Sequence, residues 1–131
     1  MQLISYLVEN DNDVKWGLVT RTVGMEKINT GEKYPTDRHL ANYVFSADQG
    51  RTLDEYQIVY ITDGEGIFES ASQSPVRITA GMAFMLFPGE WHNYCPTKYK
   101  GWSQMWIGFR GANIDDRVRN GFLKKENPVF N

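Results

Sequence analysis

The stretch that says most about the fold of this 131-residue chain is GMAFMLFPGEWHNY, residues 81–94. Gly81 permits a sharp entry into a short apolar segment, and Pro88-Gly89 ends that segment in a turn. Polar and aromatic residues then begin a new extended segment at His92. A short apolar segment followed by a Pro-Gly turn and a second short segment indicates two strands of a β-rich fold.

The rest of the sequence repeats this pattern. Turn signals separate short segments that are rich in β-branched and aromatic residues. The strands expected from these segments are 18–23, 56–62, 66–70, 76–79, 83–87, 92–94 and 101–109. Strands at such spacing, without a helical pattern between them, predict an all-β sandwich or barrel.

The segment 56–62, YQIVYIT, is apolar on both of its faces, so the strand is expected to be covered on both sides. The residues that follow it, DGEG at 63–66, predict a tight hairpin turn into the next strand.

Strand alternation in the segment 102–109, WSQMWIGF, separates two faces. One face carries Trp102, Gln104 and Trp106, and the other carries Met105, Ile107 and Phe109. We expect the second face to lie in the core. The first face combines indole rings with an amide, which suits a half-polar interior better than a dry one.

Length and composition indicate a single domain over residues 1–131. Residues 1–13, which end in an Asn/Asp-rich segment, are a candidate N-terminal arm. Residues 114–123 predict a short helix, and 114–131 are expected to begin a connection to a further part of the protein.

The charge balance argues against a nucleic-acid-binding surface, because fourteen Lys and Arg stand against sixteen Asp and Glu, for a net charge of −2. The sequence offers no secretory signal and no apolar stretch long enough for a bilayer, so no membrane partner is expected. The lone cysteine, Cys95, excludes an internal disulfide and fits a cytoplasmic protein.

Two segments resemble the conserved motifs of cupin β-barrels. Residues 81–94 resemble the second motif, and GRTLDEYQIVYITDGEG, residues 50–66, resembles the first. The resemblance implies a cupin-like double-stranded β-helix, that is, a jelly-roll barrel. A metal-binding cupin carries two histidines and a carboxylate in its first motif, whereas this chain has Gly50 to Leu53 and Gln57 there. Since only His92 keeps a ligand identity, no metal and no other cofactor are expected.

A more specific resemblance comes from the tyrosine-rich strand, the DGEG segment, LFPGEWHNY, and the GWSQMWIGFRG segment that ends at Gly111. Together they resemble the N-terminal sensor domain of AraC-type bacterial transcription regulators, over residues 34–111 and more weakly as far as 128–129. The resemblance implies a small effector, often a sugar, inside the barrel. It also implies a homodimer formed through later helices, and DNA binding only through a C-terminal helix-turn-helix domain that this chain lacks.

Four candidate ligand-binding residues come from the motif strands. By the cupin register His92 faces the barrel interior, where its imidazole can hydrogen-bond an effector hydroxyl. Tyr94 lies on the same face and offers a phenol, and the family pattern places a pocket residue there. Trp106 can stack on a sugar ring, again as the family pattern implies, and Gln104 can bridge hydroxyls. The plainer alternatives are core packing for the aromatic rings and backbone or solvent partners for the polar groups.

Three further candidates are Gln57, Arg38 and Arg51. Gln57 stands where a cupin carries its carboxylate, and an amide there can donate and accept without a metal. The two arginines can hold a carboxylate or a pair of hydroxyls, although most arginines lie on the surface. No catalytic residue is assigned.

Two other functions remain open at this stage. A metal-free epimerase or isomerase would use His92 as base and Tyr94 as acid, although no neighbouring carboxylate is present in the sequence to orient the histidine. A purely structural dimerisation domain would have a filled barrel, with Trp106 packed against Tyr94.

Overall fold

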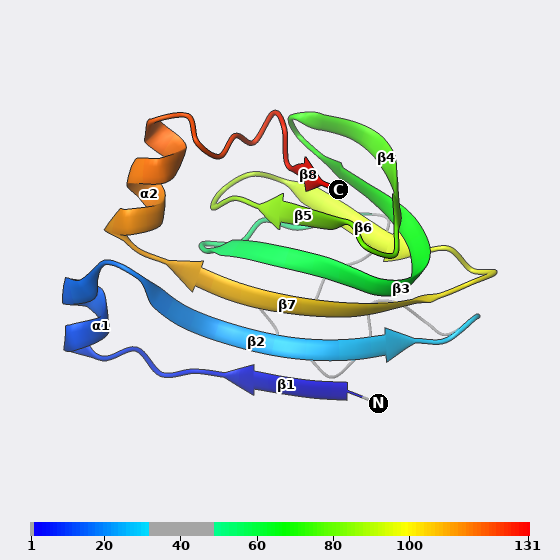
Figure 1. The fold of residues 1–131 in the computed structure, drawn as a ribbon, viewed down its shortest axis with the longest axis horizontal. Helices are drawn as coiled ribbons and strands as arrows, with labels where there is room; N and C mark the ends of the chain where they lie inside the picture. Colours follow the sequence, from blue (N-terminus) through cyan, green and yellow to red (C-terminus); the bar gives the residue numbers. More distant parts are fainter. Residues whose placement is uncertain (1, 32–48) are drawn as a thin grey trace.

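The computed structural model of the chain describes residues 2–31 and 49–131. Its elements, drawn in Figure 1, are β1 (Gln2–Tyr6), α1 (Asp11–Trp16), β2 (Val19–Ile28), β3 (Tyr56–Ser70), β4 (Gln73–Thr79), β5 (Ala83–Leu86), β6 (His92–Pro96), β7 (Trp102–Arg110), α2 (Ala112–Arg119) and β8 (Val129–Phe130). The expectation of a mostly β fold with a short C-terminal helix is confirmed.

The strands form a sheet that folds over on itself. The larger layer has the order β1-β2-β7-β3-β5-β8, and each neighbouring pair is antiparallel. Past the partners of β7, the strand β3 continues into a second layer, where it pairs with β4 and β6. Figure 1 shows β3 curving from one layer to the other. Because both layers share β3, they face each other and enclose the interior of the fold.

The hairpin predicted at residues 63–66 is wrong, because β3 passes through these residues without turning back. Gly64 has a φ of +85°, and the register with β7 shifts between Ile61 and Asp63. A Cβ atom on Gly64 would lie 2.2 Å from the carbonyl oxygen of Gly101. The glycine therefore serves a bulge at the point where β3 changes layer, and its turn-like sequence misled the prediction.

Aromatic rings fill one end of the interior. The rings of Phe68 and Phe84 stack with centroids 4.5 Å apart, and Tyr94 and Trp102 lie beside them at 5.0 and 6.4 Å from Phe84. The aliphatic residues of this cluster are Ile28, Leu53, Val59, Ile61, Ile78 and Leu86. A smaller cluster, in which Ile114 of α2 packs against Tyr56, Met85, Phe87 and Phe109, holds the helix on the outside of the larger layer.

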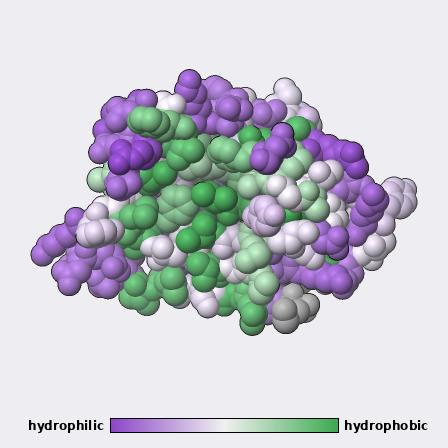
Figure 2. All heavy atoms as spheres, viewed as in Figure 1, coloured by the Kyte–Doolittle hydropathy of each residue, from purple (hydrophilic) through white to green (hydrophobic). Residues whose placement is uncertain are grey.

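The outer face of the larger layer is apolar and exposed, which corrects two expectations. Ile58 and Tyr60 of β3 are 37% and 43% exposed, so 56–62 is not covered on both sides. Met105 and Ile107 of β7 are 44% and 39% exposed, so they do not face the core; Phe109 is buried because α2 covers it. Figure 2 shows apolar surface gathered over the middle of this face. Strand alternation separated the two faces of β7 correctly. The more apolar face was expected in the core, but it is the exposed outer face.

Residues 2–13 hold more structure than an arm followed by a turn. The strand β1 pairs with β2 along its whole length, and the Asn/Asp-rich segment begins α1. The side chain of Asn10 caps this helix by accepting from the backbone N–H of Asp13 at 2.9 Å. Among the residues described, no helix has the length and apolar content needed to cross a membrane.

Candidate functional site

Three of the predicted site residues meet on the inner side of β6. The guanidinium of Arg51 donates from Nε to Nε2 of His92 at 2.9 Å and from a terminal nitrogen to the Tyr94 hydroxyl, also at 2.9 Å. His92 and Tyr94 are buried, and their rings stack with centroids 6.0 Å apart. The carbon of the guanidinium lies 5.7 Å from the centre of the Tyr94 ring. The three side chains therefore form one cluster, in which Arg51 is the hydrogen-bond donor.

The His92 imidazole in this cluster is neutral. Burial, reinforced by the positive charge of Arg51, lowers its pKa from 6.5 to about 3, and the backbone of Glu90 opposes this shift. Because Nε2 accepts a hydrogen bond from Arg51, the ring proton resides on Nδ1.

The described residues around His92 do not fit a metal ion, although many cupins hold one. The lone pair of Nε2 is directed at a guanidinium, and a cation placed beside it would be repelled by Arg51. Within residues 2–31 and 49–131, no three His, Cys, Asp or Glu side chains are grouped as a metal site requires. We therefore derive no metal chemistry from this site.

A second group of predicted residues lies on the inner side of the larger layer. Gln57 and Gln104 are 2% and 4% exposed, and Trp106 is half-buried. Trp106 donates from Nε1 to the Thr22 hydroxyl at 3.3 Å. The side-chain oxygen of Gln104 is buried and accepts no hydrogen bond from the residues that the structure describes. A buried amide oxygen without a donor is unusual and calls for an explanation.

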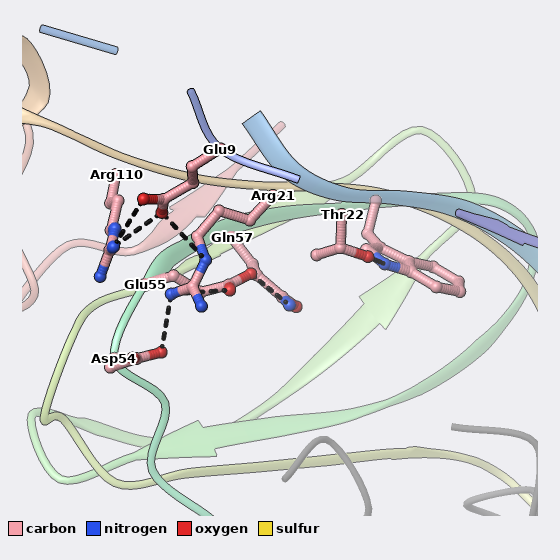
Figure 3. Close-up of polar contacts among 8 residues, drawn as sticks. Glu9, Arg21, Thr22, Asp54, Glu55, Gln57 and Arg110 are labelled. Atoms are coloured by element: carbon pink, nitrogen blue, oxygen red, sulfur yellow. Dashed lines mark hydrogen bonds and ion pairs between the residues drawn. The ribbon is translucent and has the colours of Figure 1, made fainter. Parts of the chain in front are cut away.

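Gln57 is linked to charged groups that the sequence analysis missed. Its amide donates to the Glu55 carboxylate at 3.2 Å, and Glu55 is fully buried. Arg21 lies 3.7 Å from Glu55, 3.1 Å from Asp54 and 3.5 Å from Glu9. Figure 3 shows these three contacts as dashed lines. Alternation along 55–57 places Glu55 and Gln57 on one face, and this was the only available signal for Glu55.

This charged network continues to the surface at β7. Arg110 contacts Glu9 at 2.7 Å, and Figure 3 shows Glu9 between Arg110 and Arg21. The hydrogen bond from Arg110, with the positive charges of Arg110 and Arg21, keeps the pKa of Glu9 below its usual range. The network therefore joins the segment that precedes α1 to the interior amide of Gln57.

The last predicted ligand-binding residue, Arg38, lies outside the described residues, so its assignment stays a prediction. Two hollows of about 400 and 500 Å³ open on the surface beside α2, and both are lined by Tyr56, Pro88 and Asp115. Neither includes a predicted ligand-binding residue. Cys95 is half-buried, and burial together with nearby Glu69 raises the pKa of its thiol, so the thiol is not activated.

The sequence from residue 33 to residue 131 matches the family described as the AraC-like ligand binding domain. This chain belongs to that family. It is 34% identical over 88 residues to the raffinose operon transcriptional regulatory protein RafR of Pediococcus pentosaceus, which covers 66% of this chain. The chain spans only 31% of the length of that relative.

The AraC-like ligand-binding domain shares its fold with cupin proteins. The protein YhaK from Escherichia coli superposes with a TM-score of 0.61 at 18% identity, over 86% of this chain and 45% of that one. The cupin domain of Cnp3 from Schizosaccharomyces pombe gives 0.51 at 9% identity, over 91% and 71%. A predicted oxalate decarboxylase from Thermotoga maritima gives 0.51 at 17%, over 83% and 80%. At these identities the likeness establishes the cupin-like barrel alone, which agrees with the fold expected from the sequence.

Proposed function

We propose that this domain binds a small, neutral, hydroxylated metabolite inside its barrel, and that it is the effector-sensing part of an AraC-type transcription regulator. The observation that carries the proposal is the Gln104 carboxamide oxygen, which is buried and lies on the inner side of β7 beside the half-buried Trp106. It accepts no hydrogen bond from any residue in 2–31 or 49–131. An acceptor left unpaired in the free domain is available for a ligand hydroxyl, and its desolvation has then already occurred before binding.

The charges inside the barrel favour a neutral ligand over an anionic one. Arg51 already donates to His92 and Tyr94, so an incoming carboxylate would compete for these hydrogen bonds. The larger layer presents the buried carboxyl groups of Glu26 and Glu55 to the interior. Hydroxyl groups can donate to such oxygens, whereas a carboxylate ligand has no proton to donate to them.

Trp106 supplies the apolar part of the site in this proposal. An indole with one face against β2 can offer the other to the C–H groups of a sugar ring. Gln104 and Gln57 would bind hydroxyls beside it, and the cluster of Arg51, His92 and Tyr94 would close the opposite side. Arg38 remains a predicted contributor.

The similarity to RafR, a raffinose operon regulator, favours an oligosaccharide or one of its component sugars as the effector. The comparison covers about a third of that relative, so regulation of transcription by the whole protein is part of the proposal. DNA binding, in a homodimer or otherwise, would then belong to parts of the protein outside this chain.

The epimerase alternative is disfavoured by the state of its catalytic pair. A general base needs a pKa near the working pH, and that of His92 is lowered to about 3. Its Nε2 accepts from Arg51, and the Tyr94 hydroxyl does the same. The filled-barrel alternative expected Trp106 to pack against Tyr94. Trp106 packs against the core cluster that contains Tyr94 and is also hydrogen-bonded to Thr22 on β2, so binding measurements decide between this alternative and a sensor.

Titration calorimetry with raffinose, sucrose, galactose, glucose and fructose tests the proposal. At least one of these sugars should bind, and a concentration of 100 times Kd should add about 2.7 kcal/mol to the free energy of unfolding. Trp106→Ala should abolish binding. Met105→Ala, on the outer face of the same strand, should leave it unchanged. Binding that persists without the indole would place the site elsewhere, and absence of binding by all five sugars would count against a sugar sensor.

A further inference from the structure

We propose that Gly24 determines which ligands the barrel accepts, because the missing side chain at this position lets the Trp106 indole lie back against β2. The position of the indole on Gly24 is argued from the structure without a ligand. The effect on ligand size rests on the proposed function.

Gly24 and Trp106 are directly paired across β2 and β7. A Cβ atom on Gly24 would lie 2.3 Å from Cζ2 and 2.6 Å from Cη2 of the indole. Side chains at such paired positions normally stand next to each other with their Cβ atoms about 5 Å apart. Here the ring instead covers the backbone of its partner, which only a glycine allows.

The requirement at this position is one of space and not of backbone conformation. Gly24 does not have a positive φ, so an alanine could adopt its backbone geometry without strain. The collision involves Cζ2, Cη2 and Cε2 of the indole, which is rigid and half-buried, so relieving it requires the whole ring to move away from β2.

The hydrogen bond to Thr22 fixes the ring in this position. Thr22 is 1% exposed and accepts from the indole N–H at 3.3 Å. Its place depends on a second glycine, because a Cβ atom on Gly108 would lie 2.4 Å from the Thr22 methyl carbon. Gly108, like Gly24, lacks a positive φ. Two glycines on adjacent strands thus make room for the Trp106 ring and for the residue that holds it.

The consequence for binding follows from the direction in which the ring must move. The backbone of β2 lies directly behind the ring, so a side chain at position 24 pushes the indole away from the sheet, toward the barrel interior. The ring then occupies space that a ligand would use, and its stacking face is turned. Glycine at this position therefore permits a bulky ligand such as an oligosaccharide, whereas alanine restricts the site to smaller molecules or closes it.

The first test requires no ligand. Crystal structures of the unliganded wild type and of Gly24→Ala should differ at Trp106, with the indole displaced from β2 and its hydrogen bond to Thr22 lost. An indole that stays on β2 in Gly24→Ala would overturn the inference, whatever the domain binds.

The second test uses the sugar that binds the wild type most tightly among the five named above. Gly24→Ala should weaken that binding at least about tenfold, which corresponds to 1.4 kcal/mol. In a Trp106→Leu background, where binding is expected to be lost, the free energy of unfolding is measured instead; the same substitution should lower it less than it does in the wild type, since no ring remains to be displaced. Met25→Ala is the matched control, because Met25 is next to Gly24 on β2 and lies on the opposite face.

Thr22→Val keeps the test decisive if Gly24→Ala does not fold. Valine matches the shape of threonine and removes the acceptor, so the indole should lose its orientation and the affinity should fall about threefold or more. Equal affinity in the wild type and in every variant that folds would overturn the inference. If no sugar binds the wild type but the ring moves in Gly24→Ala, the steric inference stands and the proposed function fails.

Discussion

Arg51 and His92 are paired twice, once through their side chains and once through their backbones. The guanidinium Nε lies 2.9 Å from Nε2 of the imidazole. The backbone N–H of each residue also donates to the carbonyl oxygen of the other at 3.0 Å. This double link ties the segment before β3 to the start of β6, and it holds an uncharged histidine next to a permanent positive charge.

The first prediction concerns the pH dependence of stability. The pKa of His92 is about 3 in the folded state and 6.5 in the unfolded chain. Between these values the unfolded chain binds the extra proton, so the folded state loses up to about 1.4 kcal/mol per pH unit as pH falls. Above pH 6.5 the histidine has no effect on the slope. Urea unfolding of wild type and His92→Gln from pH 7.5 to 4 measures this contribution.

Glutamine keeps an acceptor near the Nε2 position and cannot be protonated in this range. The difference between the two proteins should therefore grow steadily below pH 6.5, while carboxylates such as Glu65, whose pKa is lowered by Arg77 and Lys100, contribute equally to both. Parallel curves for the two proteins would mean that the pKa of His92 is the same in the folded and unfolded states.

The second prediction is that replacing Gln104 makes the domain more stable and its ligand binding weaker. Replacing a buried, unpaired amide with an apolar side chain of similar volume removes a desolvation cost, so Gln104→Met should raise the free energy of unfolding by about 1 kcal/mol. The same variant should bind the effector sugar more weakly. Chemical denaturation and calorimetry on one preparation measure both effects. A destabilised Gln104→Met would show that the amide is satisfied within the fold and would remove the main support for the ligand site.

The sequence predicted most of the strands because turn residues mark their ends, but it gave an arm where β1 and α1 lie. It failed where a local signal has two physical meanings. The DGEG segment resembles a hairpin turn, but Gly64 serves a bulge inside β3. Similarly, apolar residues such as Ile107 indicate burial in a core and exposure on an uncovered sheet face equally well, and nothing local distinguishes these cases.

The candidate site could be predicted only in part. The motif resemblance and strand alternation placed His92, Tyr94, Gln57 and Gln104 on the inner side, where they are buried. The role of Arg51 was missed, because its pairing with His92 spans 41 residues of sequence. The packing of the Trp106 ring on the backbone of Gly24 could not be predicted either, since it depends on the register between β2 and β7.

The third prediction concerns the attachment of α2. Tyr56 at the start of β3 donates to Asp115 of α2 at 2.7 Å, and burial together with this hydrogen bond raises the pKa of the phenol. Tyr56→Phe keeps the ring packing against Phe109 and loses only the hydroxyl, so it should cost about 1 kcal/mol. In an Asp115→Ala background the same change should cost almost nothing. Equal costs in both backgrounds would show that the hydrogen bond does not hold the helix.

The fourth prediction tests which face of β7 and β3 is the core. Ile107 is 39% exposed on the outer face, whereas Ile61 is fully buried on the inner face. Ile107→Lys places its charge in solvent and should change the free energy of unfolding by about 1 kcal/mol or less, mainly through lost strand preference. Ile61→Ala opens a cavity and should cost about 2–5 kcal/mol. Urea denaturation compares the two variants directly.

The lysine also interrupts the apolar patch formed with Ile58 and Tyr60, so it should reduce self-association of the isolated domain in sedimentation experiments. A lysine variant that unfolds would mean that this face is buried, and the hydrophobic assignment of the two faces made from the sequence would then have been right.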